Sequence, residues 1–188
     1  MGTYDEEVAR LYQNMDKNEA LSNRHVVYGA AKREARERLK ELSSQFSTAL
    51  VVTAIPFPLG IYDERPSLIL ATLRNILDHG PLEFTEGTQL FDVIPVEECA
   101  RALYLIGNKG RANAEYFIGS GHPRQVREYV SAMVKRYAPE RTPHFGALPY
   151  KDVHLPKEVF STVSLEQDTG VRCAVSFEDA CDRVYAWL

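Results

Sequence analysis

The longest regular pattern in the chain is helical. From His25 to about Gln45, small or apolar residues recur on one face, and lysine, arginine and glutamate fill the other. An apolar, β-branched run follows at 49–55 and ends at Pro56. A continuous apolar run of this length is typical of a fully buried strand, most often in a parallel sheet. The sequence therefore predicts a long helix followed by a buried strand.

Helical and strand patterns alternate along the rest of the chain. A proline near the start and a glycine at the C-terminal cap mark a helix over 66–79. Ser176 precedes an acid-rich first turn and opens the last helix. The other expected elements are a strand within 90–96, a helix over 97–106, a strand over 115–118 and a helix over 126–137. Polar residues 5–22 and the Pro-rich segment 138–160 are expected to be irregular. This alternation predicts an α/β architecture.

Composition and charge exclude several classes of partner. The 188 residues carry a formal net charge of −4, and no run of lysine and arginine exceeds two residues, which argues against nucleic-acid binding. No apolar stretch approaches the about 18 residues that a membrane helix needs. The N-terminus has neither the basic start nor the apolar segment of a signal peptide. We therefore expect a cytoplasmic protein that does not enter membranes.

Cysteine and histidine usage points the same way. The three cysteines, Cys99, Cys173 and Cys181, are an odd number without a secretion signal, which indicates free thiols in a reducing compartment. Neither their spacing nor that of the five histidines fits a zinc site. No metal is expected.

The residues that carry candidate chemistry are Tyr28 and Lys32. Four residues apart on a helix, they stand on one face, one turn from each other. A free phenol has a pKa near 10, and a nearby ammonium favours the phenolate, so such a tyrosine can exchange protons with a hydroxyl or carbonyl oxygen. Taken alone, the spacing is a weak signal. A half-buried anchoring tyrosine beside a solvated lysine is the structural alternative.

The surrounding segments change that interpretation. Tyr28-Gly29-Ala30-Ala31-Lys32 resembles the Y-G-x-x-K of extended short-chain dehydrogenases, in the NAD-dependent epimerase/dehydratase family. Upstream, Gly2-Thr3-Tyr4-Asp5-Glu6 is similar to the end of the preceding family strand. Downstream, similar segments follow in the family's order at 87–102, 116–121, 144–150 and 169–178. The resemblance covers nearly the whole chain.

The resemblance implies roles for individual residues. Tyr28 would be the catalytic acid/base, Lys32 would bind the nicotinamide ribose of NAD or NADP and assist Tyr28, and the catalytic Thr3 would bond the reacting oxygen. The family's substrates are mostly nucleotide sugars. Asp92 would hold its loop beside the substrate, and Asp92 and Arg124 are the candidate substrate contacts. In the family the Tyr28 helix forms a helical bundle between subunits, which implies a homodimer.

The resemblance also implies a partial fold. The chain would be a single partial domain, 1–188, with the end of a Rossmann-type parallel sheet in 1–60 and mainly the small α/β substrate-binding lobe in 61–188. The family's Gly-rich dinucleotide fingerprint does not precede Thr3. The strand over 49–55 would lack a neighbour on one side. Three explanations stand: a fragment of a longer enzyme, a non-catalytic remnant, or completion by another chain.

Some positions depart from the family pattern. Ile55 and Phe91 stand where the family has arginines, and Pro58 stands where it has asparagine. Arginine forks are natural phosphate clamps, so these changes favour an altered substrate or loss of activity. Arg65, Arg124 and Arg127 are possible replacements, although surface charge is the simpler interpretation. Two functions follow: a nucleotide-sugar epimerase, dehydratase or reductase, or a module that binds a sugar phosphate or a partner.

Overall fold

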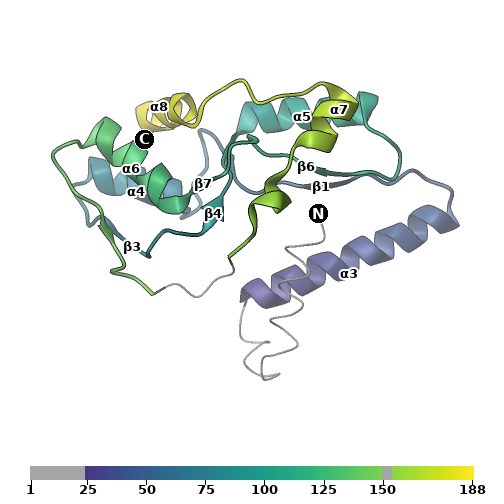
Figure 1. Cartoon of the computed structure of the whole chain (residues 1–188), viewed down its shortest axis with the longest axis horizontal. Helices are drawn as coiled ribbons and strands as arrows, with labels where there is room; N and C mark the ends of the chain where they lie inside the picture. Colours follow the sequence, from purple (N-terminus) through teal and green to yellow (C-terminus); the bar gives the residue numbers. More distant parts are fainter. Residues whose placement is uncertain (1–23, 150–153) are drawn as a thin grey trace.

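The computed structural model describes residues 24–149 and 154–188. Thr3 and the segment predicted to be irregular at 5–22 lie outside the described residues. In Figure 1 the long helix α3 (Arg24–Gln45) runs below the β1–β6 strand pair, and the other helices of the described residues gather in two groups above. Both groups of helices pack on two-stranded sheets.

The helices after α3 are α4 (Leu68–Leu77), α5 (Val96–Lys109), α6 (Val126–Tyr137), the 3-10 helix η1 (Lys157–Phe160), α7 (Val163–Thr169) and α8 (Phe177–Trp187). The strands are β1 (Val52–Ala54), β2 (Pro58–Leu59), β3 (Glu83–Phe84), β4 (Leu90–Phe91), β5 (Ile94–Pro95), β6 (Glu115–Phe117), β7 (Arg124–Gln125) and β8 (His144–Phe145). Parallel pairs join β1 to β6, β2 to β5 and β3 to β8, and an antiparallel pair joins β4 to β7.

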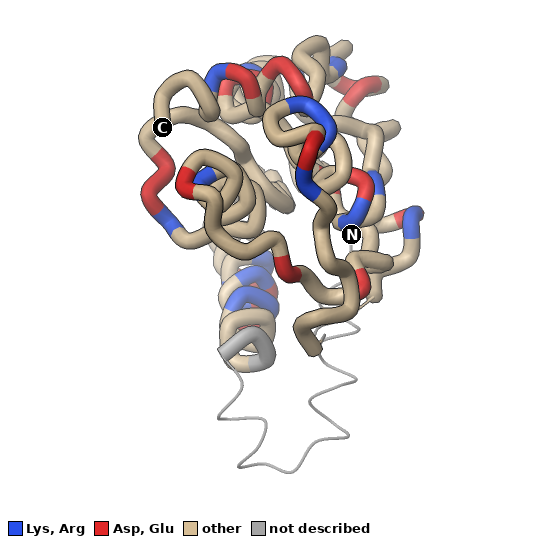
Figure 2. The backbone as a smooth tube through the Cα atoms, turned by 90° about the vertical axis from the view of Figure 1, so that its left-hand side faces the viewer, with Lys and Arg blue, Asp and Glu red and all other residues tan. Residues whose placement is uncertain are grey.

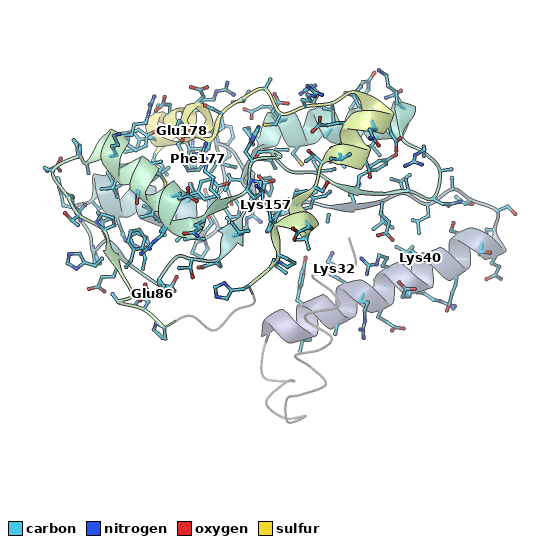
Figure 3. The ribbon with its side chains drawn as sticks, in the orientation of Figure 1. Lys32, Lys40, Glu86, Lys157, Phe177 and Glu178 are labelled. Atoms are coloured by element: carbon cyan, nitrogen blue, oxygen red, sulfur yellow. The ribbon has the colours of Figure 1, made fainter. Side chains whose placement is uncertain are left out.

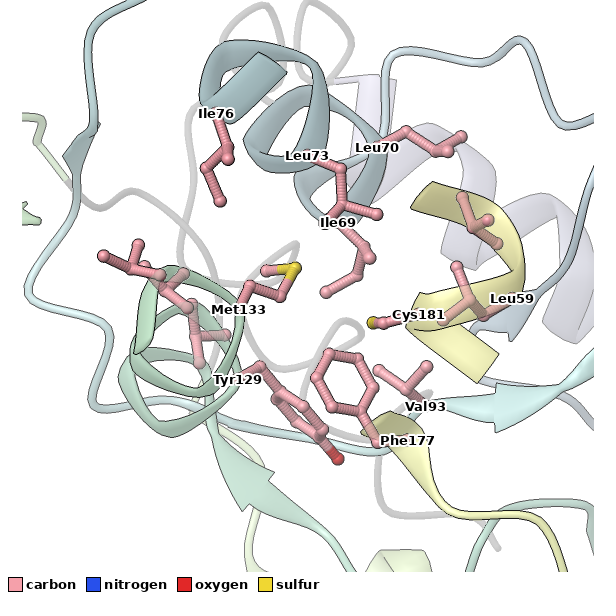
Figure 4. Packing of buried hydrophobic residues seen from close by; sticks show 14 of the residues in the cluster. Leu59, Ile69, Leu70, Leu73, Ile76, Val93, Tyr129, Met133, Phe177 and Cys181 are labelled. Carbon is pink, nitrogen blue, oxygen red and sulfur yellow. The ribbon is translucent and has the colours of Figure 1, made fainter. Parts of the chain in front are cut away.

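The larger apolar core lies between α4, α6 and α8 (Figure 4). Leu70 of α4 and Val130 of α6 are completely buried there. The ring of Tyr129 meets that of Phe177 edge-on, with centroids 4.7 Å apart. This core fixes the end of the molecule that carries β3, β4 and β7.

A second core lies under α5 and α7, against β6. Tyr116 of β6 is buried in it, and its hydroxyl donates a hydrogen bond to the carboxylate of Asp168 at 2.7 Å. The same hydroxyl accepts a hydrogen bond from the backbone N–H of Arg111 at 2.8 Å. The β1–β6 pair therefore depends on the helices on one face.

Local sequence explains where the helices begin. The Ser176 hydroxyl accepts a hydrogen bond from the Asp179 N–H at 3.1 Å, which caps α8 as its sequence predicts. Gln125 and Glu128 form a capping box at the start of α6, whose bounds match the predicted 126–137. The predicted helix over 25–45 is also confirmed, although Leu39 on its apolar face is 51% exposed.

The prediction of a fully buried strand over 49–55 was wrong. Strand β1 covers Val52–Ala54, its residues are half-buried, and Ile55 is 38% exposed. Its one partner in the part of the chain described is β6. No other described residues pair with its second edge, so within residues 24–149 and 154–188 the apolar run has a strand on one side, as the sequence also predicts. The segment 138–160, which was predicted to be irregular, contains strand β8 and the 3-10 helix η1. Both elements are too short to produce a hydrophobic periodicity in the sequence.

We expect the core between α4, α6 and α8 to dominate the free energy of unfolding. Leu70→Ala removes a fully buried side chain and should cost about 2–5 kcal/mol through lost burial and the cavity left behind. Leu103→Ala, at a position 42% exposed on α5, is the matched control and should stay within about 0.5 kcal/mol. Urea titration followed by circular dichroism measures both. Equal losses would place the dominant packing elsewhere.

Candidate active site

Tyr28 and Lys32 lie on one face of α3. The Lys32 ammonium stands 5.4 Å from the centroid of the Tyr28 ring, within the range of a cation–π contact. Tyr28 is 63% exposed, and Lys32 is also exposed. Figure 3 shows Lys32 on α3 with the body of the molecule above the helix. The spacing predicted from the sequence thus brings the two side chains together where a ligand can reach them.

The second half of α3 is joined to the sheet by a charged contact. The Lys40 ammonium lies 3.1 Å from the carboxylate of Glu115, the first residue of β6. This hydrogen bond and charge raise the pKa of Lys40 above its ordinary value. Figure 3 shows Lys40 further along α3 from Lys32. The contact ties the helix that carries Tyr28 to the strand pair.

Tyr28 lines a cavity of about 800 Å³. Ala54, Ile55 and Pro56 reach it from the carboxyl end of β1, and Phe117 reaches it from the end of β6. Ligands in open α/β sheets bind outside the carboxyl ends of the strands, which is where this cavity lies. The geometry makes it the candidate active site.

The cavity wall is mostly apolar and partly aromatic. Phe91 lines it and packs on Phe57, with ring centroids 5.4 Å apart. Phe117 and Phe160 both line it and meet edge-on at 5.7 Å. Sequence patterns did not identify Leu148, Leu155 or Phe160 as wall residues, because they come from the Pro-rich segment, which has no period.

Asp92 lies away from this wall, in the interior. It is fully buried, and its carboxylate accepts hydrogen bonds from the Ser120 N–H at 3.1 Å and the Ser120 hydroxyl at 2.5 Å. A third comes from the Gly121 N–H at 3.4 Å. A Cβ on Gly119 would come within 2.2 Å of the carboxylate, so only glycine fits there. These contacts are those of a residue that holds a loop, the first of its two expected roles.

Arg124 is held by α8 and by two rings. Its guanidinium contacts the Glu178 carboxylate at 2.6 Å and lies 5.6 Å from the ring centroid of Tyr129 and 5.9 Å from that of Phe177. The guanidinium lowers the pKa of Glu178 below its ordinary value. Figure 3 places Phe177 and Glu178 at the α8 end of the molecule. Arg124 does not line the cavity, so the structure does not bring it to Tyr28.

The other two arginines considered as phosphate ligands also have contacts of their own. Arg65 pairs with Asp63 at 2.8 Å, and Arg127 lies 5.0 Å from the ring centroid of Phe145. Basic and acidic segments alternate along the tube in Figure 2. Arg111 and Asp168, far apart in the sequence, form an ion pair at 2.7 Å.

Residues 24–149 and 154–188 contain no group of histidine, cysteine and acidic side chains arranged to hold a metal ion. Within the same ranges, no helix has the length and apolar character needed to cross a membrane.

These features define a class of protein. Parallel strand pairs covered by helices, with a cavity at the carboxyl ends of the strands, are typical of α/β proteins of Rossmann type. The chain is a member of the NAD dependent epimerase/dehydratase family, whose model matches residues 4–119. The match includes Tyr28, Lys32 and Asp92, whereas Thr3 and Arg124 lie outside it.

Individual relatives agree with this membership. The chain is 24% identical over 173 residues to a dTDP-glucose 4,6-dehydratase of Neisseria meningitidis, covering 85% of this chain and 48% of that protein. It resembles the structure of Thermotoga maritima UDP-glucose 4-epimerase with UDP-glucose, at a TM-score of 0.73 and 18% identity over 85% of this chain and 52% of the other. The Bacillus anthracis dTDP-glucose 4,6-dehydratase in complex with NAD also gives 0.73, at 17% identity over 85% and 51%.

The chain is shorter than the relatives that it matches. The chain spans about half the length of the curated relatives it matches, 48% and 46%. The matched solved structures confirm the expected fold class at the level of a Rossmann-type α/β fold.

Burial shifts the pKa of the Asp92 carboxyl group, so the contribution of this residue to folding stability depends on pH. Desolvation raises its pKa above the ordinary 3.8, and the Ser120 and Gly121 hydrogen bonds only partly oppose this. The folded protein then holds this proton more tightly than the unfolded chain, so the stability that Asp92 contributes falls as pH rises above 3.8. Asp92→Asn does not titrate. We expect the stability of wild type relative to this variant to decline as pH rises. Thermal unfolding across pH measures it, and a pH-independent difference would contradict the shift.

Proposed function

We propose that the complete protein is an NAD(P)-dependent epimerase, dehydratase or reductase in which Tyr28 exchanges a proton with an oxygen of a nucleotide sugar or related small molecule. The supporting observation is the position of Tyr28 at the wall of the 800 Å³ cavity, with the Lys32 ammonium 5.4 Å from its ring centroid. The family membership supports the reaction type.

Each residue has a defined part in this proposal. Tyr28 donates or accepts the proton at the reacting hydroxyl or carbonyl oxygen. Lys32 holds the ribose next to the nicotinamide in this proposal, with its ammonium 5.4 Å from the centroid of the Tyr28 ring. The exposed hydroxyl and ammonium suit that end of the cofactor, which when bound supplies the hydride exchange. Thr3 is assigned by resemblance as the third group on the reacting oxygen.

Asp92 acts at a distance in this proposal. It is a positioning residue, because its carboxylate fixes the Gly119–Gly121 turn and does not line the cavity. Arg124 likewise serves the substrate lobe through its pair with Glu178. The free thiols of Cys99, Cys173 and Cys181 support a reducing, cytoplasmic location.

Tyr28→Phe in the complete protein should abolish turnover while the cofactor still binds. The change removes the hydroxyl and keeps the ring beside Lys32, so we expect the rate to fall by about 100-fold or more. Tyr104→Phe is the matched control, because Tyr104 is 70% exposed on α5 and is not part of the cavity wall. Steady-state kinetics and cofactor titration measure both. Retained turnover in Tyr28→Phe would refute the assignment.

A second function is favoured by the cavity wall itself. Ile55 and Phe91 line it at the two positions where the family pattern has arginines. A non-catalytic module that binds a sugar phosphate or a partner subunit would tolerate such changes. It predicts no binding of NAD or NADP to the complete protein, together with measurable association with a partner. It fails if the protein binds neither a sugar phosphate nor a partner.

We also propose that the complete protein is a homodimer through α3. Val27, Ala31, Ala35 and Leu39 recur at four-residue intervals and are exposed, with Leu39 at 51%. Leu39→Glu places a charge in that stripe and should shift the protein toward monomer, whereas Arg38→Glu, beside it on the charged face, should not. Sedimentation equilibrium of the complete protein measures this. A clean wild-type monomer would contradict the proposal.

A further inference from the structure

The departures from the family pattern gather in one place. Ile55 and Phe91 are far apart in the sequence, yet both line the cavity that contains Tyr28. Ile55 is 38% exposed, and Phe91 is half-buried against Phe57. Two positions at which the resemblance expects guanidinium groups are thus apolar surface in the same wall.

The charges left in the wall balance each other. Among the described residues that line the cavity, Arg36 is the one basic side chain and Glu83 the one acidic side chain. Arg36 lies on the same face of α3 as Tyr28 and Lys32, two turns from Tyr28. A diphosphate needs a net positive site, preferably with arginine forks, and this wall does not offer one.

The polar groups of the wall are partly used internally. The Thr72 hydroxyl donates to the Leu68 carbonyl at 2.7 Å, and the Asn75 amide donates to the Pro81 carbonyl at 2.9 Å. A sugar ring presents several hydroxyls, each of which needs a partner once it is buried. Thr85 and Gln89 also line the cavity, but most of the other described wall residues, including Phe117 and Phe160, offer a hydroxyl only carbon.

We infer that the cavity takes a ketone or secondary alcohol carried on an apolar, ring-bearing skeleton, and not a nucleoside diphosphate sugar. The oxygen of such a substrate would meet the Tyr28 hydroxyl, and its skeleton would lie between the apolar and aromatic side chains of the wall. The inference rests on the proposed function for the role of Tyr28. It concerns the substrate class, which a binding experiment can test without turnover.

Calorimetry on the 188-residue chain tests the substrate class with two probes, 2-acetonaphthone and dTDP-glucose. Burial of the apolar ketone should give a negative heat-capacity change, and its affinity should be the same at low and high salt. dTDP-glucose should show no saturable binding. Saturable, salt-sensitive binding of dTDP-glucose at the cavity would overturn the inference.

Substitutions locate the binding. Ala71 is an exposed residue of α4 that lines the cavity, so Ala71→Trp should fill the space and weaken ketone binding by about tenfold or more. Ala100→Trp makes the same change at an exposed alanine of α5 that is not part of the wall, and should bind like wild type. Circular dichroism checks that both variants fold. Equal effects of the two substitutions, or no ketone binding by wild type, would overturn the inference.

Experiments can contradict the proposed function and the inferred substrate class independently of each other. Tyr28→Phe should weaken ketone binding by about tenfold at most, because it removes one hydrogen bond to the ketone oxygen while the ring and the wall remain. If the complete protein with this change still turned over, the proposed function would fail while the cavity inference stood. If Tyr28→Phe were inactive but dTDP-glucose competed with the ketone for wild type, the substrate class would be wrong and the function would stand.

Discussion

The two halves of the molecule meet at one buried carboxylate. Asp92 follows β4 and is itself followed by Val93, which belongs to the core between α4, α6 and α8, and then by Ile94, which belongs to the core under α5 and α7. Its hydrogen bonds to Ser120 and Gly121 fix the turn that follows β6. Burying a polar group costs free energy unless it is hydrogen-bonded. These hydrogen bonds therefore favour one position of β4 relative to β6.

The cavity exists because of this arrangement. One wall comes from the ends of β1 and β6, another from α4 and β4, and a third from η1. None of these segments is long, and the strand pairs alone would not hold them. The helices on the two cores set the positions of the walls, and α3 brings the tyrosine to them.

Regular elements were predictable where a period or a cap was present. The amphipathic repeat and capping box of α6, the Ser176 cap of α8 and the four-residue spacing of Tyr28 and Lys32 are local features, and the structure has them where the sequence predicts. The burial of β1 was not predictable in the same way, because it depends on which strands lie beside it. The wall residues Leu148, Leu155 and Phe160 come together only through tertiary contacts, and no local pattern marks them. Asp92 was recognised by resemblance, but only the structure separates its bonds to the loop from contact with a ligand.

The ion pair between Lys40 and Glu115 anchors α3 to the strand pair near the C-terminal end of the helix. The ion pair lies near one end of the helix, and Tyr28 lies 12 residues away toward the other, about 18 Å along the axis. A tilt of about five degrees around that anchor would move the phenol by about 1.5 Å over such an arm. In enzymes, misplacing a reacting group by about 1 Å can lower the reaction rate by about 100-fold. Because both charged side chains are partly exposed, dissolved salt weakens this ion pair, so the strength with which it holds α3 to the strand pair depends on ionic strength.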